Sequence, residues 1–327
     1  MTGAVRAVTL IANPTSAGGG AAKVLDAVAD GLESRGVHVE RVRSRSVEHT
    51  VEAARTACDR GDVVGAVGGD GMLRIVAAAI VGRPGAVFAA IPAGRGNDFV
   101  GAVGLPTETD AVVDALVEGV AVPIDTGRAV GADGVPHPYL TIAACGFDAD
   151  ANQRANDAPS RLGPLAYVWG MLGTLRELRP IPYRLTHDDG SSEVRALTVV
   201  VANTARYGGG MRVAPDATPS DGRFDVVVIE HSGPHPDRCT IRDRARLLRS
   251  FPGVFRGDHV ALPEVRVERT AEIHVAADGP LAVFADGDPI GTLPMTFTVD
   301  TEGLQLIVPR THPLASPAPA PVAPTSA

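Results

Sequence analysis

The stretch Val67-Gly68-Gly69-Asp70-Gly71 is the most informative part of this chain. It follows the apolar run 63–67, which is typical of a buried strand, and precedes the helix-like run 72–81. Glycines at such a turn let the backbone approach a ligand closely, and the first N–H groups of the helix attract an anion. An aspartate there repels phosphate unless a divalent cation bridges the two, or unless it holds a ribose or a loop. The stretch therefore predicts a turn that handles phosphate.

Strand and helix patterns alternate through the first third of the chain. This alternation predicts βαβ units and a parallel sheet. Three of the strands end in glycine-bearing turns, at 13–20, 68–71 and 92–98, and in an open α/β sheet ligands lie beyond the carboxyl ends of the strands. We therefore expect the three turns to share one site. The predicted strands are 5–12, 37–42, 63–67 and 86–91, and the predicted helices cover 22–32, 48–60, 72–81 and 110–118.

After about Asp125 short β-type runs dominate, which favours an antiparallel sandwich or barrel. We predict a Rossmann-like α/β domain with a parallel sheet over 1–125 and an antiparallel β-sandwich domain over 126–311, whose last strand can return to the first domain. A Pro- and Ala-rich tail, 312–327, is expected to be disordered. The β-type runs are 139–143, 184–186, 195–202, 224–230, 264–269, 272–276, 282–285 and 297–299; helix-like inserts lie at 162–178 and 241–251.

Composition excludes several classes of function. The chain has 327 residues and a formal net charge of -8, which argues against a dedicated nucleic-acid binder. Its three cysteines, Cys58, Cys145 and Cys239, are widely spaced and indicate a reducing compartment rather than a disulfide framework. No signal peptide or apolar run of membrane-spanning length is present in the sequence. We expect a cytoplasmic protein, at most peripheral at the inner face of a membrane.

The phosphate turn has no P-loop of the GxxxxGK[ST] form. Instead, several segments resemble the diacylglycerol kinase catalytic-domain family, which also includes sphingosine and ceramide kinases. Three are the turns 13–16, 68–71 and 92–99, followed by 104–106. Two further segments, 207–217 with 221–226 and 286–289, are similar to motifs of the second domain of that family.

The resemblance implies a two-domain kinase that binds ATP and Mg²⁺ and phosphorylates a lipid hydroxyl at a membrane surface. It implies Asp286 as the base, with Asp288 second and Asp125 as a relay, while Asp70 and Asp98 would organise nucleotide and magnesium. A structural magnesium site would use the carboxylate of Asp221 and the backbone carbonyls of Thr218 and Arg223. The nucleotide-binding residues would be Asn13, Pro14, Thr15, Ser16, Gly18, Ser44, Gly68, Gly69, Asp70, Gly71, Met72, Arg74, Gly94, Arg95, Asn97 and Asp98.

The chain departs from the family pattern close to these residues. Met72, Arg74 and Ile75 stand where the family has Thr and then Asn-Glu, Arg95 replaces a threonine, and Asp288 replaces a glutamate. Two alternatives therefore stay open: a regulatory homologue that binds nucleotide without turnover, and a kinase for a soluble acceptor such as NAD. A homodimer is compatible with the sequence, although nothing in the sequence requires one.

Overall fold

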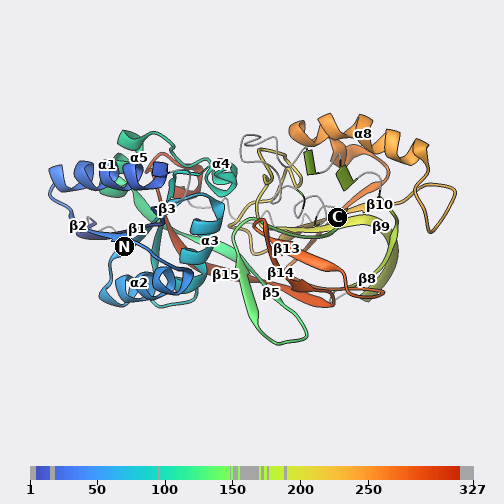
Figure 1. Ribbon diagram of the computed structural model, residues 1–327, viewed down its shortest axis with the longest axis horizontal. Coiled ribbons are helices and arrows are strands. Elements are labelled where there is room, and N and C mark those ends of the chain that lie inside the picture. The colour runs from blue at the N-terminus through green and yellow to red at the C-terminus, as the bar shows by residue number, and fades with distance from the viewer. Residues whose placement is uncertain are drawn as a thin grey trace, which may run out of the picture.

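Two lobes lie side by side in the computed structural model, and the first third of the chain forms most of one of them (Figure 1). The structure describes residues 5–14, 19–94, 96–147, 149, 154, 169–170, 173–174, 177–187 and 190–316. An α/β lobe with parallel strands is followed by a β-sandwich lobe with antiparallel strands, which confirms the predicted fold class.

The first lobe is a parallel sheet with strand order β2-β1-β3-β4, covered by helices on both faces. α1 and α5 pack over one face and α2 and α3 over the other, so apolar side chains fill two separate layers. Each strand is buried almost throughout except β2, which lies at the edge. The elements are β1 (Ala7–Ala12), α1 (Gly20–Ser34), β2 (His38–Arg43), α2 (Val47–Arg60), β3 (Val63–Gly68), α3 (Asp70–Ile80), β4 (Val87–Pro92), α4 (Asp98–Val103) and α5 (Thr109–Glu118).

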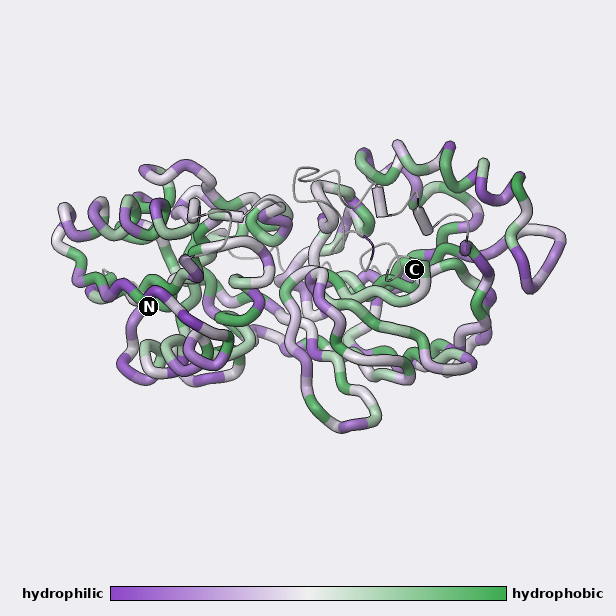
Figure 2. Tube along the Cα trace, in the orientation of Figure 1, coloured by the Kyte–Doolittle hydropathy of each residue, from purple (hydrophilic) through white to green (hydrophobic). Residues whose placement is uncertain are grey.

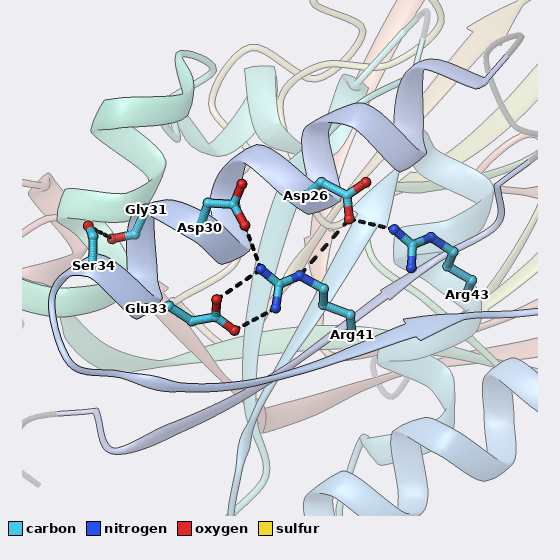
Figure 3. A network of polar contacts seen from close by, with 7 residues as sticks. All are labelled: Asp26, Asp30, Gly31, Glu33, Ser34, Arg41 and Arg43. Carbon is cyan, nitrogen blue, oxygen red and sulfur yellow. Dashed lines mark hydrogen bonds and ion pairs between the residues drawn. The ribbon is translucent and has the colours of Figure 1, made fainter.

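Charged side chains fix α1 over the exposed edge strand β2 (Figure 3). Arg41 lies between Asp30 at 2.6 Å and Glu33 at 2.5 Å, and Arg43 contacts Asp26 at 2.5 Å. Exposed pairs of this kind contribute little individually to the free energy of unfolding. Charges along an edge strand do, however, oppose pairing with another chain.

The second lobe is a curved antiparallel sheet with order β14-β13-β7-β9-β8-β12, to which β10 and β11 add beside β9. Alternate residues of its strands point to opposite faces, so Val199 and Val201 fill the inside of the sandwich while Val200 and Ala202 face outward. The elements are β6 (Pro136–Tyr139), β7 (Ile142–Gly146), β8 (Ile181–His187), β9 (Gly190–Ala202), β10 (Phe224–Glu230), α8 (Ile241–Arg256), η3 (Asp258–Ala261), β11 (Val265–Thr270), β12 (Glu272–Ala277), β13 (Ala282–Ala285) and β14 (Asp288–Thr292).

Two long antiparallel strands, β5 (Val120–Val130) and β15 (Met295–Val308), run through both lobes. The second half of β15 lies parallel to β4 in the first lobe, at Gln305 and Leu306. Its first half pairs with β12 in the second lobe, and an irregularity between Asp300 and Leu304 separates the two halves. The lobes are therefore joined by a continuous two-stranded ribbon and not by a loose linker.

Several elements differ from the sequence-based predictions. β5 and β14 carry no predicted strand, and β15 extends far beyond the predicted run 297–299. The run predicted at 139–143 is broken at Leu140 and Thr141, between β6 and β7. His312–Ser316, assigned above to a disordered tail, instead forms the short turn η4 (Pro313–Ala315), whose His312 Nε2 lies 2.9 Å from the Val103 carbonyl oxygen. Most of the predicted insert 162–178 lies outside the described residues.

Candidate active site

The glycine turns after β1, β3 and β4 lie at one edge of the sheet, because these three strands are neighbours. The turns of β3 and β4 touch: Ala93 N–H donates to the Gly68 carbonyl at 2.8 Å. A Cβ atom added to Gly94 would lie 2.3 Å from the Cα of Gly69, so no larger residue fits. This close backbone approach leaves a surface of main-chain groups at the start of α3, which fits a bound phosphate.

The other predicted nucleotide residues near these turns have mainly local partners. Asn97 accepts from Gly94 N–H at 3.0 Å and donates back to its carbonyl, which closes the turn after β4. Met72 N–H donates to the Gly69 carbonyl at 2.9 Å. Ser44 is buried, and both its N–H and its Oγ point to the Ala12 carbonyl at the end of β1. Asn13 and Pro14 follow β1, and Thr15, Ser16, Gly18 and Arg95 lie outside the described residues.

Asp70 and Asp98 place two carboxylates beside these turns. Asp70 Oδ1 accepts from Phe99 N–H at 3.1 Å, which fixes the start of α4. Asp98 accepts from the N–H groups of Gly208 at 2.8 Å and Gly209 at 3.0 Å, in the second lobe. Burial, and then the neighbouring charge of Asp70, raise the pKa of Asp98 to about 6 against the lowering effect of the backbone N–H groups.

The partner of Asp98 is a loop of three consecutive glycines, Gly208–Gly210, between Tyr207 and Met211. All three glycines have left-handed φ angles, of 63°, 79° and 94°, and Tyr207 and Met211 pair through two backbone hydrogen bonds. The left-handed backbone turns successive N–H groups toward the carboxylate. This segment is recognisable in the sequence as a family motif, whereas its contact with Asp98 was not predicted. Three glycines in a row were the available signal.

Asp286 lies in the turn after β13, in the left-handed region at φ 49°. Its carboxylate accepts from Leu140 N–H at 2.7 Å and from both the N–H and the hydroxyl of Thr141. Leu140 and Thr141 lie in the break between β6 and β7, where their N–H groups are free of strand pairing. We call these two residues the socket of Asp286. Burial raises the pKa of Asp286, while Thr141, the two N–H groups and Arg74 act in the opposite direction.

Arg74 and Asp288 form an ion pair between the two lobes. Arg74 lies in α3, one turn after Asp70, and its Nε and Nη2 donate to Asp288 Oδ2 at 3.1 and 2.7 Å. Gly71 faces the same carboxylate, since a Cβ there would lie 4.0 Å from Asp288 Oδ2. The phosphate turn and the Asp286–Asp288 turn are thus brought together across the junction of the lobes.

Asp125 is buried in β5 and ties three segments together. Its carboxylate accepts from Gly222 N–H at 2.8 Å and from Glu302 N–H at 3.0 Å. Its carbonyl accepts from the side-chain amide of Asn203, which also donates to the Leu140 carbonyl at 2.9 Å. Asn203 therefore links Asp125 to the socket of Asp286. It was not predicted, although a polar pair directly after the buried strand β9 was the signal for it.

The predicted metal residues lie in the loop before β10. Thr218 contacts Ser220 through its hydroxyl, and the carboxylate of Asp221 accepts from Arg223 N–H at 3.1 Å. The other oxygen of Asp221 is paired with Arg269, whose Nε also lies 3.0 Å from Asp225. Within the described part of the chain no cluster of three His, Cys, Asp or Glu residues has metal-binding geometry. The carboxylate of Asp221 thus has a guanidinium as its partner in this structure, and the magnesium site at Thr218, Asp221 and Arg223 stays a prediction.

An apolar pocket lies in the second lobe between α8 and the outer face of β9 and β10. Phe147, Leu197 and Met211 line it from the sheet side, and Leu247 and Phe251 from the helix. Met211 also belongs to the cluster on the outer face of β7 and β9, with Ile142 and Val200. One continuous apolar face therefore leads from the start of β7, next to the Asp286 socket, to this pocket.

Comparisons with known proteins agree with this arrangement. Residues 7–129 match the model of the diacylglycerol kinase catalytic domain, and residues 141–308 match that of the YegS C-terminal NAD kinase beta sandwich-like domain. A diacylglycerol kinase of Mycobacterium tuberculosis (strain ATCC 25618 / H37Rv) is 35% identical over 306 residues, which cover 93% of this chain and 95% of that protein. One from Staphylococcus saprophyticus is 28% identical over 92% of this chain and 95% of that protein.

Solved structures share the fold. A candidate diacylglycerol kinase of Bacillus anthracis superposes with a TM-score of 0.76 over 95% of this chain and 98% of that one, at 18% identity. A second structure from that organism gives a TM-score of 0.69 over 95% of this chain and all of its own, at 15% identity. Both lobes are matched in each case. From the two domain matches and the full-length relative, the chain belongs to the diacylglycerol kinase catalytic-domain family.

Proposed function

We propose that this protein transfers the γ-phosphoryl group of ATP to a hydroxyl group of diacylglycerol or a closely related lipid. The observation that carries the proposal is the position of Asp286. Its carboxylate lies at the junction of the lobes, beside Arg74 of the helix that begins at the Gly68–Gly71 turn. Nucleotide on the first lobe and an acceptor on the second would meet at this carboxylate.

Asp286 suits the role of base. Thr141 donates two hydrogen bonds to Oδ1, whereas Oδ2 accepts from Leu140 N–H alone among the described residues and keeps a lone pair for an incoming hydroxyl. A raised pKa makes a carboxylate a better proton acceptor. Asp286 would take the proton of the lipid hydroxyl as its oxygen attacks the γ-phosphorus, and the bond to ADP breaks.

The glycine turns and the acidic pair would hold the nucleotide. Gly69 and Gly94 leave the backbone open at the start of α3, and Asp70 and Asp98 lie next to it. Carboxylates beside phosphates fit a bound magnesium ion, which supplies charge neutralisation during phosphoryl transfer. Arg74 would hold Asp288 in place and add positive charge next to the reacting group.

The apolar face of the second lobe favours a lipid acceptor over a soluble one. From Ile142 to Gly146, β7 covers about 13 Å at ~3.3 Å per residue. An acyl chain spans about 15 Å, half of the ~30 Å hydrocarbon core of a bilayer. A lipid hydroxyl at Asp286 would therefore allow its chains to follow Ile142 toward the pocket lined by Met211 and Phe251.

The test is phosphoryl transfer to diacylglycerol by purified protein, followed as labelled phosphate in the organic phase. Asp286→Asn is expected to lower kcat by about 10²–10⁴-fold while nucleotide affinity stays near that of the wild type, because removal of a base affects only the transfer step. Asp278→Asn is the matched control. Asp278 also precedes a glycine in a turn of this lobe, but it is exposed.

The outcomes separate the alternatives. Wild-type turnover in Asp286→Asn contradicts the assignment of the base. Nucleotide binding by the wild type without transfer to any lipid contradicts the proposed activity and favours a regulatory homologue. Transfer to NAD with no labelled phosphate in the organic phase contradicts the lipid acceptor.

A further inference from the structure

Helix α8 (Ile241–Arg256) has a face that the lobe does not use. Its inner face lines the apolar pocket with Leu247, Phe251 and Val254. None of the helix residues is fully buried. Figure 1 shows α8 on the outside of the second lobe, over β9 and β10, and Figure 2 shows hydrophilic and hydrophobic residues alternating along it. A capping box at Thr240 and Asp243 fixes the start of the helix.

The outer face carries an apolar stripe. Ile241 is 82% exposed, Leu248 42% and Phe255 40%. These residues are seven positions apart, and seven residues come within about 20° of two full helical turns, so the three side chains lie in line along one side of α8. They account for three of the seven exposed large hydrophobic residues found in the described part of the chain.

An arginine stripe runs beside the apolar one. Arg242, Arg249 and Arg256 each follow an apolar stripe residue by one position, so they are also seven apart and are rotated by about 100° around the helix. All three are exposed. Arg256 pairs with Asp258 at 2.6 Å, whereas among the described residues Arg242 and Arg249 have no ion-pair partner. With five arginines and one aspartate, α8 has a formal charge of +4, in a chain whose net charge is -8.

We propose that the outer face of α8 docks onto an anionic lipid bilayer. An apolar stripe flanked by arginines on an exposed helix is the pattern of helices that lie in the membrane interface. Charge complementarity favours this occupant over a second copy of the chain. In a symmetric dimer through α8 the two arginine stripes would face each other, whereas an anionic bilayer attracts both.

Docking in this orientation places the apolar pocket close to the acyl chains. The pocket lies directly beneath α8, within about 10 Å of the interface, since a helix with its side chains is about 10 Å across. The outer face of α8 would contact the bilayer, while its inner face lines the pocket that holds the acyl chains of the substrate. The purpose of docking rests on the proposed lipid kinase function, but binding to vesicles is measured independently of it.

The test is sedimentation of the full chain with vesicles of phosphatidylcholine alone or with about 30% phosphatidylglycerol. Wild-type protein is expected to bind only the anionic vesicles, and to be released by about 0.5 M salt, which screens surface charge. Arg242→Gln with Arg249→Gln should weaken binding about 25-fold, at roughly fivefold per arginine. Arg45→Gln with Arg55→Gln, an equal loss of charge on the exposed surface of the first lobe, is the matched control and should bind as the wild type does.

A second variant tests the apolar stripe. Ile241→Ser with Leu248→Ser should also weaken binding while the circular dichroism stays that of a folded protein, since both side chains are on the exposed side of the helix. Kinase activity of both α8 variants toward a dispersed short-chain diacylglycerol should equal that of the wild type. Only activity toward lipid held in vesicles should fall.

Several results would overturn the proposal. Equal vesicle binding by the arginine variant and the wild type excludes α8 as the docking surface, and wild-type binding to neutral vesicles excludes charge as its basis. A dimer in solution that the stripe variant converts to a monomer identifies this face as a contact between copies. Loss of short-chain activity in the α8 variants, with vesicle binding retained, assigns the helix to the reaction instead. Absence of wild-type kinase activity with anionic vesicle binding intact contradicts the proposed function and leaves docking standing.

Discussion

Arg74 and Asp288 are two departures from the family pattern that contact each other. Asp288 is one methylene shorter than the glutamate that is usual in the family. The longer Arg74 side chain reaches Asp288 from α3 at 2.7 Å. Its positive charge also lowers the pKa of the neighbouring Asp286. The pair therefore brings the two altered motif residues into direct contact across the junction of the lobes.

We predict that Arg74→Gln shifts the acidic limb of the pH profile of kcat/KM to higher pH. Removal of the guanidinium withdraws a charge that favours the ionised form of Asp286, so the pKa of Asp286 rises. The rate at neutral pH should fall about tenfold, for a loss of ~1.4 kcal/mol of transition-state stabilisation. Steady-state kinetics across the pH range, with diacylglycerol as acceptor, measures both effects.

A double-mutant cycle serves as the control for this interpretation. Asp288→Asn should slow transfer to a similar extent, and the double variant should be no slower than either single variant, because both remove the same contact. If the losses of transition-state stabilisation in the two single variants add in the double variant, the two residues act separately. The same holds if the acidic limb of the pH profile of kcat/KM does not shift in Arg74→Gln. The free energy of unfolding should change by only about 0.5–1 kcal/mol, since this ion pair is partly exposed.

The loop 218–223 and strand β11 meet through Arg269, and we propose that its guanidinium takes the place of a metal ion as the partner of the Asp221 and Asp225 carboxylates. Burial raises the pKa of Asp225, against the opposing effect of Arg269. We predict that the thermal midpoint of the nucleotide-free wild type does not respond to magnesium or to a chelator. In Arg269→Gln, Asp221 and Asp225 lose their counter-charge. Magnesium at about ten times its Kd should then restore ~1.4 kcal/mol of stability.

Thermal unfolding of three proteins decides this point. Arg269→Lys keeps a positive charge between the carboxylates and should remain insensitive to magnesium, as the wild type does. If a chelator lowers the midpoint of the wild type and magnesium restores it, the ion implied by the family resemblance binds despite Arg269. The assignment of Arg269 as its replacement would then be wrong.

Elements with a regular apolar pattern could be predicted, and those with interrupted patterns could not. β1, β3 and β4 are apolar almost throughout, so their strands and the turns after them could be predicted from the sequence. β5 contains Pro123, Asp125 and Gly127, which break the pattern of a strand. Yet Gly127 is required there, because a Cβ would lie 2.1 Å from the ring of Tyr139. A constraint of this kind arises from packing and leaves no local signal.

The socket of Asp286 shows the same limit at the active site. A family motif named Asp286, but its donors at Leu140 and Thr141 are about 145 residues away in the sequence. They are available only because the predicted strand 139–143 is interrupted. Asn203 became recognisable as part of the site only when it was seen to bridge Asp125 and Leu140. Residue types could be predicted from sequence, whereas the hydrogen-bond network depends on tertiary contacts.

At the scale of the whole molecule, the lobes are joined by the β5–β15 ribbon and by two polar contacts across the junction. One is the Arg74–Asp288 ion pair. The other is the pair of hydrogen bonds that the Asp98 carboxylate accepts from the N–H groups of Gly208 and Gly209. The ribbon is continuous backbone and responds little to pH. Asp98 does respond, because its pKa of about 6 lies close to neutrality. Closure of the lobes is therefore expected to depend on pH through this one carboxylate.

We predict that Asp98→Asn removes a pH-dependent part of the free energy of unfolding. The pKa of Asp98 is higher in the folded protein, at about 6, than the usual 3.8, so the folded state binds this proton more tightly. The protonated carboxyl of Asp98 therefore stabilises the folded state. This contribution to the free energy of unfolding, up to ~3 kcal/mol, is lost as pH rises from about 4 to about 6.

Urea unfolding between about pH 4 and about pH 6 should show this fall in the free energy of unfolding in the wild type and in the control Asp278→Asn, but not in Asp98→Asn. An equal fall in all three proteins would place the titrating group elsewhere. Because opening of the lobes would return Asp98 to solvent and lower its pKa, small-angle scattering should also detect a more open wild-type molecule at about pH 7 than at about pH 5.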